Sequence, residues 1–267
     1  MSELAPNRCE KAIPPITTIL LTLPRLGNPY LSQSSYSILS DLLSASVNSG
    51  TQSGTEQIPA VLSAILSSPP PKSDPTVAPS WLRVLGDAML AYSSADPDAS
   101  SQEFIKVWKI VWSYFESSHA QTRKAVEQAL EALAQCITLP MVRTAVMDTP
   151  DGKSPIRSAV AQITKALDSL AYASAIPELL HVVSSLILSP NVRFEDGKST
   201  LAVETLLLPL VQKIADLRVQ KNFEHKEAVD SVISTAMRVM GPAILLEAIP
   251  LNLEPQDRFV IIPCFLL

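Results

Sequence analysis

Glycine is scarce in this sequence, with 7 residues in 267, or about 3% where a typical protein has about 7%. Phosphate-binding loops and dinucleotide-binding turns depend on glycine, and their motifs do not occur in the chain. Charged residues are also few, at 18% against the usual ~25%, while 47% of the residues are hydrophobic. These shortages argue against a nucleotide-binding enzyme and against disorder, and they favour a folded chain with a large apolar core.

Cysteine and histidine, the residues of disulfide frameworks and of many metal and catalytic sites, are few and isolated. None stands at ligand spacing from a second such residue, so the sequence predicts no disulfide framework, no metal site, no cofactor and no catalytic group. We expect Cys136 to be an inert buried thiol, His181 to lie in a core or groove, and His119 and His225 to lie at the surface. The complete set is Cys9, Cys136, Cys264, His119, His181 and His225.

An excess of basic charge is also missing, since the net charge is −5 and the isoelectric point is about 5.3. Nucleic-acid modules usually carry a basic domain or stripe, so a dedicated polyanion binder is disfavoured. The N-terminus lacks a basic segment followed by an apolar one, and no apolar run approaches the ~18 residues of a membrane span. We therefore expect neither secretion nor membrane partners.

Apolar residues recur with the period of a helix along most of the chain. Between Phe104 and Phe115 they form one wide face that includes Trp108 and Trp112. Lys106 and Lys109 interrupt this aromatic segment, which raises the alternative of a base-stacking surface. The spacing fits a buried face better, so we expect these aromatic residues and Trp81 to pack between helices.

Helix ends are marked by local chemistry. Potential capping boxes begin at Ser100 and Ser118, and Ser154 before Pro155 marks a further start. Gly241 before Pro242 predicts a corner between two helices, because glycine adopts positive φ and proline suits a first helical turn. Pro209 is expected to kink or divide the helix around it.

The predicted helices form pairs whose first members begin near residues 12, 56, 101, 156 and 199. Most of the intervals fit the ~40–47 residues of a HEAT repeat, and we assign the longer third interval to an extra loop with the sequence MDTPDGKSP. The sequence therefore predicts an all-α, HEAT/armadillo-like superhelical solenoid of about five antiparallel helix pairs, formed as a single array over residues 1–267. A compact helical bundle is the alternative. Flexible loops are expected near residues 48–55, 67–79 and 148–154.

Other polar patterns are weak as signs of chemistry. Glu127 and Glu131 are one helical turn apart, but Arg123 and Lys124 offer ion-pair partners, so we interpret them as a solvated face. A strip of basic residues is likewise a poor sign of nucleic-acid binding, because acidic residues lie among its members. These acids are Asp216, Glu224, Glu227 and Asp230. The members of the strip are Lys213, Arg218, Lys221, Lys226 and Arg238.

One stretch resembles a known family. Residues 217–253 resemble a signature of the ribosomal RNA-processing protein twelve family, in which a helix ending in Met/Leu-Gly-Pro precedes a short helix and a Pro-Leu-Asn/Glu-Leu or Ile phrase. Residues 23–43 and the aromatic helix before Ser118 and His119 also look like that family. The positions that match the signature are Met240, Gly241, Pro242, Leu245, Ile249, Pro250, Leu251 and Leu253.

The resemblance implies a large nuclear and nucleolar HEAT-repeat protein without enzymatic activity. It implies a scaffold in ribosome biogenesis that supports processing of ribosomal precursor RNA and the maturation and export of preribosomal particles. Implied partners are preribosomal proteins, precursor RNA, a Ran-type GTPase and nuclear-pore proteins, but no binding residue can be carried over. A transport-receptor-like or cytoskeletal adaptor on the same solenoid is the alternative function. After Pro255 the sequence departs from the family's Trp-Leu-Leu-Pro continuation, so we expect a fragment of a larger protein.

Overall fold

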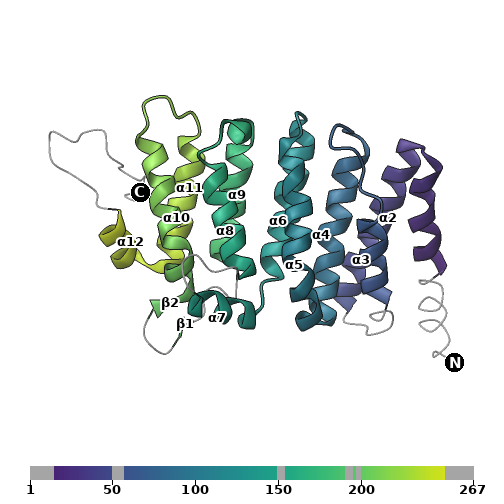
Figure 1. The fold of residues 1–267 in the computed structure, drawn as a ribbon, viewed down its shortest axis with the longest axis horizontal. Coiled ribbons are helices and arrows are strands. Elements are labelled where there is room, and N and C mark those ends of the chain that lie inside the picture. Colours follow the sequence, from purple (N-terminus) through teal and green to yellow (C-terminus); the bar gives the residue numbers. More distant parts are fainter. Residues whose placement is uncertain (1–14, 50–56, 149–153, 190–194, 197–199, 250–267) are drawn as a thin grey trace. The chain divides into compact units, whose positions relative to one another are not determined.

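The computed structural model describes residues 15–49, 57–148, 154–189, 195–196 and 200–249. The chain divides into two compact units, residues 1–136 and 137–267, which are described separately. Helices make up nearly all regular structure in the described part, which confirms the all-α prediction (Figure 1). The exception is a small antiparallel pair of strands that was not predicted, β1 (Glu195–Asp196) and β2 (Thr200–Leu201).

The first unit is built from successive helix pairs that stand side by side (Figure 1). The second helices of these pairs form a continuous layer, because α4 packs against α2 and also against α6. The first helices α3 and α5 both pack on α4. The elements are a helix over residues 15–22, η1 (Leu23–Leu26), α2 (Pro29–Ser49), α3 (Ile58–Leu66), α4 (Val77–Ala95), α5 (Pro97–Trp112), η3 (Ser113–Glu116) and α6 (Ala120–Gln135).

The contact between α4 and α6 depends on a glycine. A Cβ at Gly86 would lie only 3.2 Å from Ala129 Cα and 3.3 Å from Ala132 Cβ. The small residues on both helices therefore allow the two backbones to approach closely, which larger side chains would prevent.

Aromatic side chains fill the core of the first unit, as their spacing predicted. Trp81 and Trp108 are completely buried, and Phe104, Trp112 and Phe115 are each at most 3% exposed. Along α5 the rings of Phe104, Trp108 and Trp112 stack with centroids 5.8 and 6.1 Å apart, and Phe115 in η3 meets Trp112 edge-to-face at 5.2 Å. Lys106 and Lys109 remain exposed on the opposite face of α5. The aromatic helix is therefore core, and the base-stacking alternative is wrong for it.

The second unit also contains two helix pairs, α8 with α9 and α10 with α11. The second helices again lie together, since α9 packs on α11, while α10 contacts α7, α8 and α11. The elements are α7 (Leu139–Met147), α8 (Pro155–Ala166), η4 (Leu170–Ala175), α9 (Ile176–Leu188), α10 (Ala202–Val219), α11 (Lys226–Met240) and α12 (Pro242–Ala248).

Helix starts and ends were predicted with mixed success. The expected cap at Ser100 is wrong, because α5 begins one turn earlier and Asp96 Oδ1 accepts the backbone N–H of Ala99 at 3.0 Å. Ser118 is also wrong as a cap, since His119 occupies the N-cap position of α6 without a side-chain cap bond. Ser154 is confirmed, because its Oγ accepts the N–H of Arg157.

The extra residues of the third interval contain a helix as well as a loop. The prediction of a loop alone is wrong, because α7 forms just before the predicted loop. Pro209 lies inside α10 without dividing it into two helices. The single array over residues 1–267 remains a prediction.

The Gly-Pro corner is confirmed. Gly241 has φ 88° and ψ 156°, and it separates α11 from α12, which begins at Pro242. This region of backbone space is almost restricted to glycine, so the corner needs that residue.

Two ion pairs support the neighbouring helices. Arg218 pairs with Asp230 in a bidentate geometry at 2.5 and 3.1 Å, and Lys213 pairs with Asp168.

The predicted loops are only partly within the described residues. Most of 48–55 and 148–154 lies outside them, although α2 extends to Ser49 and α8 begins at Pro155. The loop predicted at 67–79 ends earlier, because α4 begins at Val77.

One stretch of the described residues, Leu170–Leu188, is long and apolar enough to cross a membrane by length and composition. The expectation that no apolar stretch reaches this length is therefore wrong. The stretch consists of η4 and α9, and α9 buries seven of its residues while packing on α11. These contacts are those of a core helix.

Candidate binding surface

The second helix of each pair leaves one face uncovered. On all five of these helices, residues spaced i, i+4, i+7 and i+11 are exposed or half-exposed, and this spacing follows a single helical face. We call these residues the second-helix face, considered separately within each unit. Its members are 34, 38, 41 and 45 on α2, 83, 87, 90 and 94 on α4, 124, 128, 131 and 135 on α6, 177, 181, 184 and 188 on α9, and 227, 231, 234 and 238 on α11.

In the first unit this face is mostly polar and close to neutral. Its charged members are three acids and two bases, and its remaining members are serine, glutamine, alanine and two aliphatic residues. Lys124 pairs with the buried Glu127 at 2.5 Å, which reduces the positive charge available to a ligand. Such a surface offers hydrogen-bonding groups and little attraction for phosphate. The charged members are Asp41, Arg83, Asp87, Lys124 and Glu131.

A polar cluster links α2 to α4 at the centre of this face. Ser40, which is buried, donates a hydrogen bond to Asp87 Oδ2. Burial raises the pKa of Asp87 above its usual value, and the nearby Asp41 adds to this shift, while the Ser40 hydrogen bond and the Arg83 charge oppose it. The cluster fixes α2 relative to α4 and places Asp41 and Arg83 at the surface.

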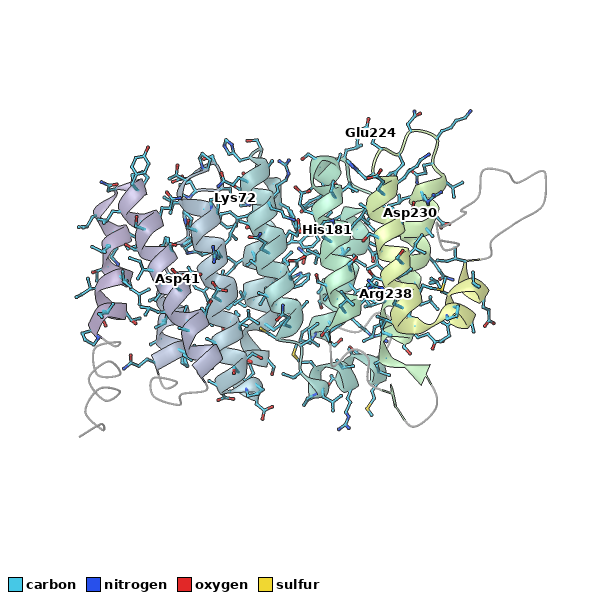
Figure 2. All side chains as sticks on the ribbon, turned by 180° about the vertical axis from the view of Figure 1, so that it is seen from behind. Asp41, Lys72, His181, Glu224, Asp230 and Arg238 are labelled. Atoms are coloured by element: carbon cyan, nitrogen blue, oxygen red, sulfur yellow. The ribbon has the colours of Figure 1, made fainter. Side chains whose placement is uncertain are left out.

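In the second unit the face carries one acid and one base. His181 is exposed on α9 and Arg238 on α11 (Figure 2). Leu188 on α9 and Glu227 on α11 are exposed as well. The prediction that His181 lies in a core or groove is thus wrong about the core, because the residue is exposed. Ser184, Ser231 and Ser234 supply the other polar groups.

Two cations of the basic strip are held in ion pairs within the second unit. Lys213 pairs with Asp168 and also donates to the carbonyl of Thr164, and Arg218 is held by Asp230. These contacts take two cations of the strip into structural ion pairs. The structure therefore supports the view that the strip is a poor nucleic-acid signal.

Of the residues considered for chemistry, Cys136 is buried, while His119 and His225 stand at the starts of α6 and α11. Cys136 is 2% exposed, and burial raises the pKa of its thiol to about 12, so the thiol stays protonated near neutral pH. His119 is the N-cap of α6, and His225 packs edge-on against Phe223 at 5.9 Å. Among the residues that the structure describes, no group of three or more His, Cys, Asp and Glu could hold a metal ion.

The environment of Glu127 differs from the solvated one that was predicted. The sequence suggested a solvated pair with Glu131, yet Glu127 is only 2% exposed and Glu131 is half-buried. The reason is that α6 is covered by the α5 and η3 elements and by α4, so a position that looks exposed on an isolated helix becomes enclosed. Its ion pair with Lys124 offsets part of the cost of burying a carboxylate.

The second-helix face was not identified from the sequence. Its signal is present as polar residues at helical spacing, for example Gln128 and Gln135 on α6 and Ser231 and Ser234 on α11. Sequence spacing alone could not select this face, because first helices carry similar polar positions. The packing of second helices on one another distinguishes it.

Comparison with known proteins identifies related chains. The family described as ribosomal RNA-processing protein 12, HEAT repeats, matches residues 116–267. The putative ribosomal RNA-processing protein 12 of Schizosaccharomyces pombe is 25% identical over 191 residues, which cover 71% of this chain and 15% of that protein. RRP12-like proteins of Homo sapiens and Gallus gallus are 22% and 24% identical, over 76% of this chain and 15% of theirs. The chain thus spans about 15% of the length of these relatives.

Proposed function

The chain belongs to the ribosomal RNA-processing protein 12 HEAT-repeat family, and from this premise we propose that it is a non-enzymatic scaffold in ribosome biogenesis. It supports the processing of ribosomal precursor RNA and the maturation and export of preribosomal particles. The match of the family over residues 116–267 is the observation that carries this proposal. The names of the fungal and vertebrate relatives point to the same process.

We propose the second-helix face as the surface that contacts the particle. Its near-neutral charge and its serine and glutamine side chains suit shaped protein surfaces better than a phosphate backbone. Contacts with protein partners then depend on shape and hydrogen bonds. Contacts of this region with precursor RNA are secondary and show a shallow dependence on salt.

The proposed location is the nucleus, with concentration in the nucleolus, where preribosomal particles assemble. Preribosomal proteins are the primary partners. A Ran-type GTPase and nuclear-pore proteins are further candidates, as the family resemblance implies. The near-neutral face also fits a transport-receptor-like adaptor, which is the alternative function.

Depletion of the protein that contains this chain separates the two functions. A ribosome-biogenesis scaffold predicts that unprocessed ribosomal RNA accumulates, which RNA blots measure, and that the tagged protein sediments with preribosomal particles in a sucrose gradient. An unrelated adaptor leaves RNA processing intact. A protein that is confined to the cytoplasm and absent from these particles would contradict the proposal.

A further inference from the structure

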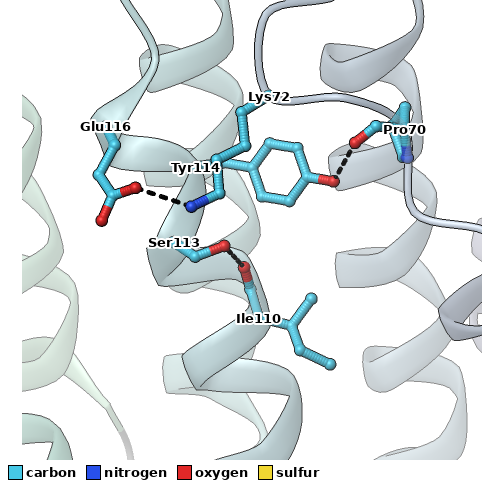
Figure 3. Close-up of polar contacts among 6 residues, drawn as sticks. All are labelled: Pro70, Lys72, Ile110, Ser113, Tyr114 and Glu116. Atoms are coloured by element: carbon cyan, nitrogen blue, oxygen red, sulfur yellow. Dashed lines mark hydrogen bonds and ion pairs between the residues drawn. The ribbon is translucent and has the colours of Figure 1, made fainter.

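The connection between α3 and α4, residues 67–76, is fastened to the turn that follows α5. Tyr114 Oη donates a hydrogen bond to the carbonyl of Pro70 at 2.6 Å, and Lys72 Nζ pairs with Glu116 Oε2 at 2.7 Å (Figure 3). Tyr114 and Glu116 belong to η3, so the connection joins one helix pair to the next. We call residues 67–76 the strap.

Of these two contacts, the hydrogen bond from Tyr114 is made by a fixed, buried side chain, whereas the ion pair of Lys72 is exposed and easily replaced. Tyr114 is 3% exposed and its ring lies 5.3 Å from that of Trp81, whose indole N–H donates to the carbonyl of Ile65. The side chains of Lys72 and Glu116 are 43% and 55% exposed. An ion pair so exposed to water contributes ~0–1 kcal/mol, so another anion can replace Glu116 at low cost.

The strap contains a serine followed by proline, a dipeptide that occurs three times in the sequence, at Ser68, Ser154 and Ser189. The structure distinguishes these serines. Ser154 is 6% exposed and caps α8 with its hydroxyl, and Ser189 is 2% exposed. Ser68 is exposed just beyond the end of α3. Of the three, Ser68 alone presents its hydroxyl to a modifying enzyme.

The residues after Ser68 favour an extended chain. Pro69, Pro70 and Pro71 lack backbone N–H groups and have fixed φ, and proline disfavours helical backbone at the residue before it. A kinase that requires proline after its target serine binds its substrate in an extended conformation and needs no N–H from that position.

We propose that Ser68 is a phosphorylation site for a proline-directed serine/threonine kinase. In the reaction, Ser68 Oγ forms a new bond to the γ-phosphorus of ATP, the bond from that phosphorus to the bridging oxygen breaks, and ADP leaves. The hydroxyl proton passes to the base of the kinase. The product carries a charge of ~−1.5 to −2 near neutral pH.

Phosphorylation places this charge on the strap, which carries a single cation. Lys72 lies four residues after Ser68, and the remaining charged residue of the strap is Asp74. The phosphate competes with Glu116 for Lys72, because a doubly charged anion attracts the ammonium group more strongly than a carboxylate does. It also adds negative charge at the C-terminal end of α3, where helix carbonyls already carry partial negative charge. The first effect loosens the strap from η3, and the second destabilises the end of α3 from which the strap begins.

Mass spectrometry after incubation of the folded full chain with a cyclin-dependent kinase and ATP tests the site. We expect phosphate on Ser68 and its loss from that position in Ser68→Ala, while Ser154 and Ser189 remain unmodified in the native chain. Ser67, which precedes Ser68 and is not followed by proline, is the matched internal control. Phosphate on Ser67, Ser154 or Ser189 in place of Ser68, or no phosphate on Ser68, would overturn the proposal.

Hydrogen–deuterium exchange tests the consequence. The amide of Asp74, which donates to Pro71 at 3.0 Å, is expected to exchange severalfold faster after phosphorylation. In Lys72→Gln the exchange is already fast and phosphorylation adds little, whereas kinase treatment leaves exchange in Ser68→Ala unchanged. Unchanged or slower exchange in the phosphorylated native chain would contradict release of the strap.

Discussion

Individual residues in the first unit show how similar side chains differ in energetic role. Trp81 and Trp108 are both completely buried, but their indole N–H groups differ. Trp81 Nε1 donates to the carbonyl of Ile65 at 3.0 Å, whereas Trp108 Nε1 is buried without a hydrogen-bond partner. The two residues therefore provide a matched comparison of a satisfied and an unsatisfied indole.

We predict that Trp81→Phe lowers the free energy of unfolding more than Trp108→Phe does, by about 1 kcal/mol. Both changes remove a similar volume, and only the first also removes a hydrogen bond. Urea unfolding followed by circular dichroism measures the difference. Equal losses, or a larger loss for Trp108→Phe, would show that the indole hydrogen bond does not stabilise this core.

Asp87 gives a prediction about pH. Its pKa is raised above 3.8 in the folded chain, chiefly by burial, so the folded state binds the proton more tightly than the unfolded state. The free energy of unfolding therefore falls as pH rises from the unfolded value through the folded one. Asp87→Asn lacks this titration, and its side-chain oxygen can still accept the Ser40 hydrogen bond.

We expect Asp87→Asn to gain stability relative to the native chain as pH increases from about 3 to about 6. Urea unfolding across this range, followed by tryptophan fluorescence, measures the change. Asp216→Asn removes an exposed acid of α10 and controls for the loss of one negative charge. Parallel pH profiles for the native chain and Asp87→Asn would contradict the argument.

At the scale of elements, local caps decide where helices begin. We predict that Asp96→Ala lowers the free energy of unfolding by ~0.5–2 kcal/mol, because the Asp96 carboxylate accepts the Ala99 N–H at the start of α5. Ser118→Ala is the control and should change stability by less than about 0.5 kcal/mol, since the Ser118 hydroxyl does not cap α6. Tryptophan fluorescence reports on α5 directly through Trp108 and Trp112. A larger effect at Ser118 than at Asp96 would reverse this assignment of caps.

The helices themselves were predictable because their apolar faces repeat regularly. The Phe104–Phe115 segment, the Ser154 cap and the Gly241–Pro242 corner all follow from local chemistry and are confirmed. Starts were less predictable where two caps compete, as with Asp96 and Ser100, because proline at position 97 favours the earlier start.

The remaining differences depend on contacts that the sequence does not display. The α7 helix is only nine residues long, and it is stabilised by packing on α8 and α10. The enclosed position of Glu127 and the exposure of His181 likewise depend on which neighbours cover α6 and α9. For the same reason the second-helix face became evident only from the packing of the second helices.

At the scale of the whole molecule, the repeat pattern predicts an elongated array. A compact chain of 267 residues would have a radius of gyration of about 18 Å. We expect small-angle X-ray scattering to give a clearly larger value with the distance distribution of an elongated particle. A globular distribution near that compact value would favour the alternative of a helical bundle.

We propose that the second-helix face attaches the protein to preribosomal particles through shape and hydrogen bonds. Gln128→Arg/Gln135→Arg adds bulk and positive charge to this face on α6, and Ser63→Arg/Gln102→Arg adds the same charge to exposed positions on α3 and α5. Both pairs are introduced into the protein that contains this chain, and circular dichroism verifies that each variant is folded.

Sedimentation of these variants with preribosomal particles in a sucrose gradient tests the claim most directly. We expect Gln128→Arg/Gln135→Arg to leave the particle fractions and Ser63→Arg/Gln102→Arg to stay with them. Attachment through phosphate charge would instead strengthen when arginine is added. Retained or increased sedimentation of Gln128→Arg/Gln135→Arg with the particles would contradict the account.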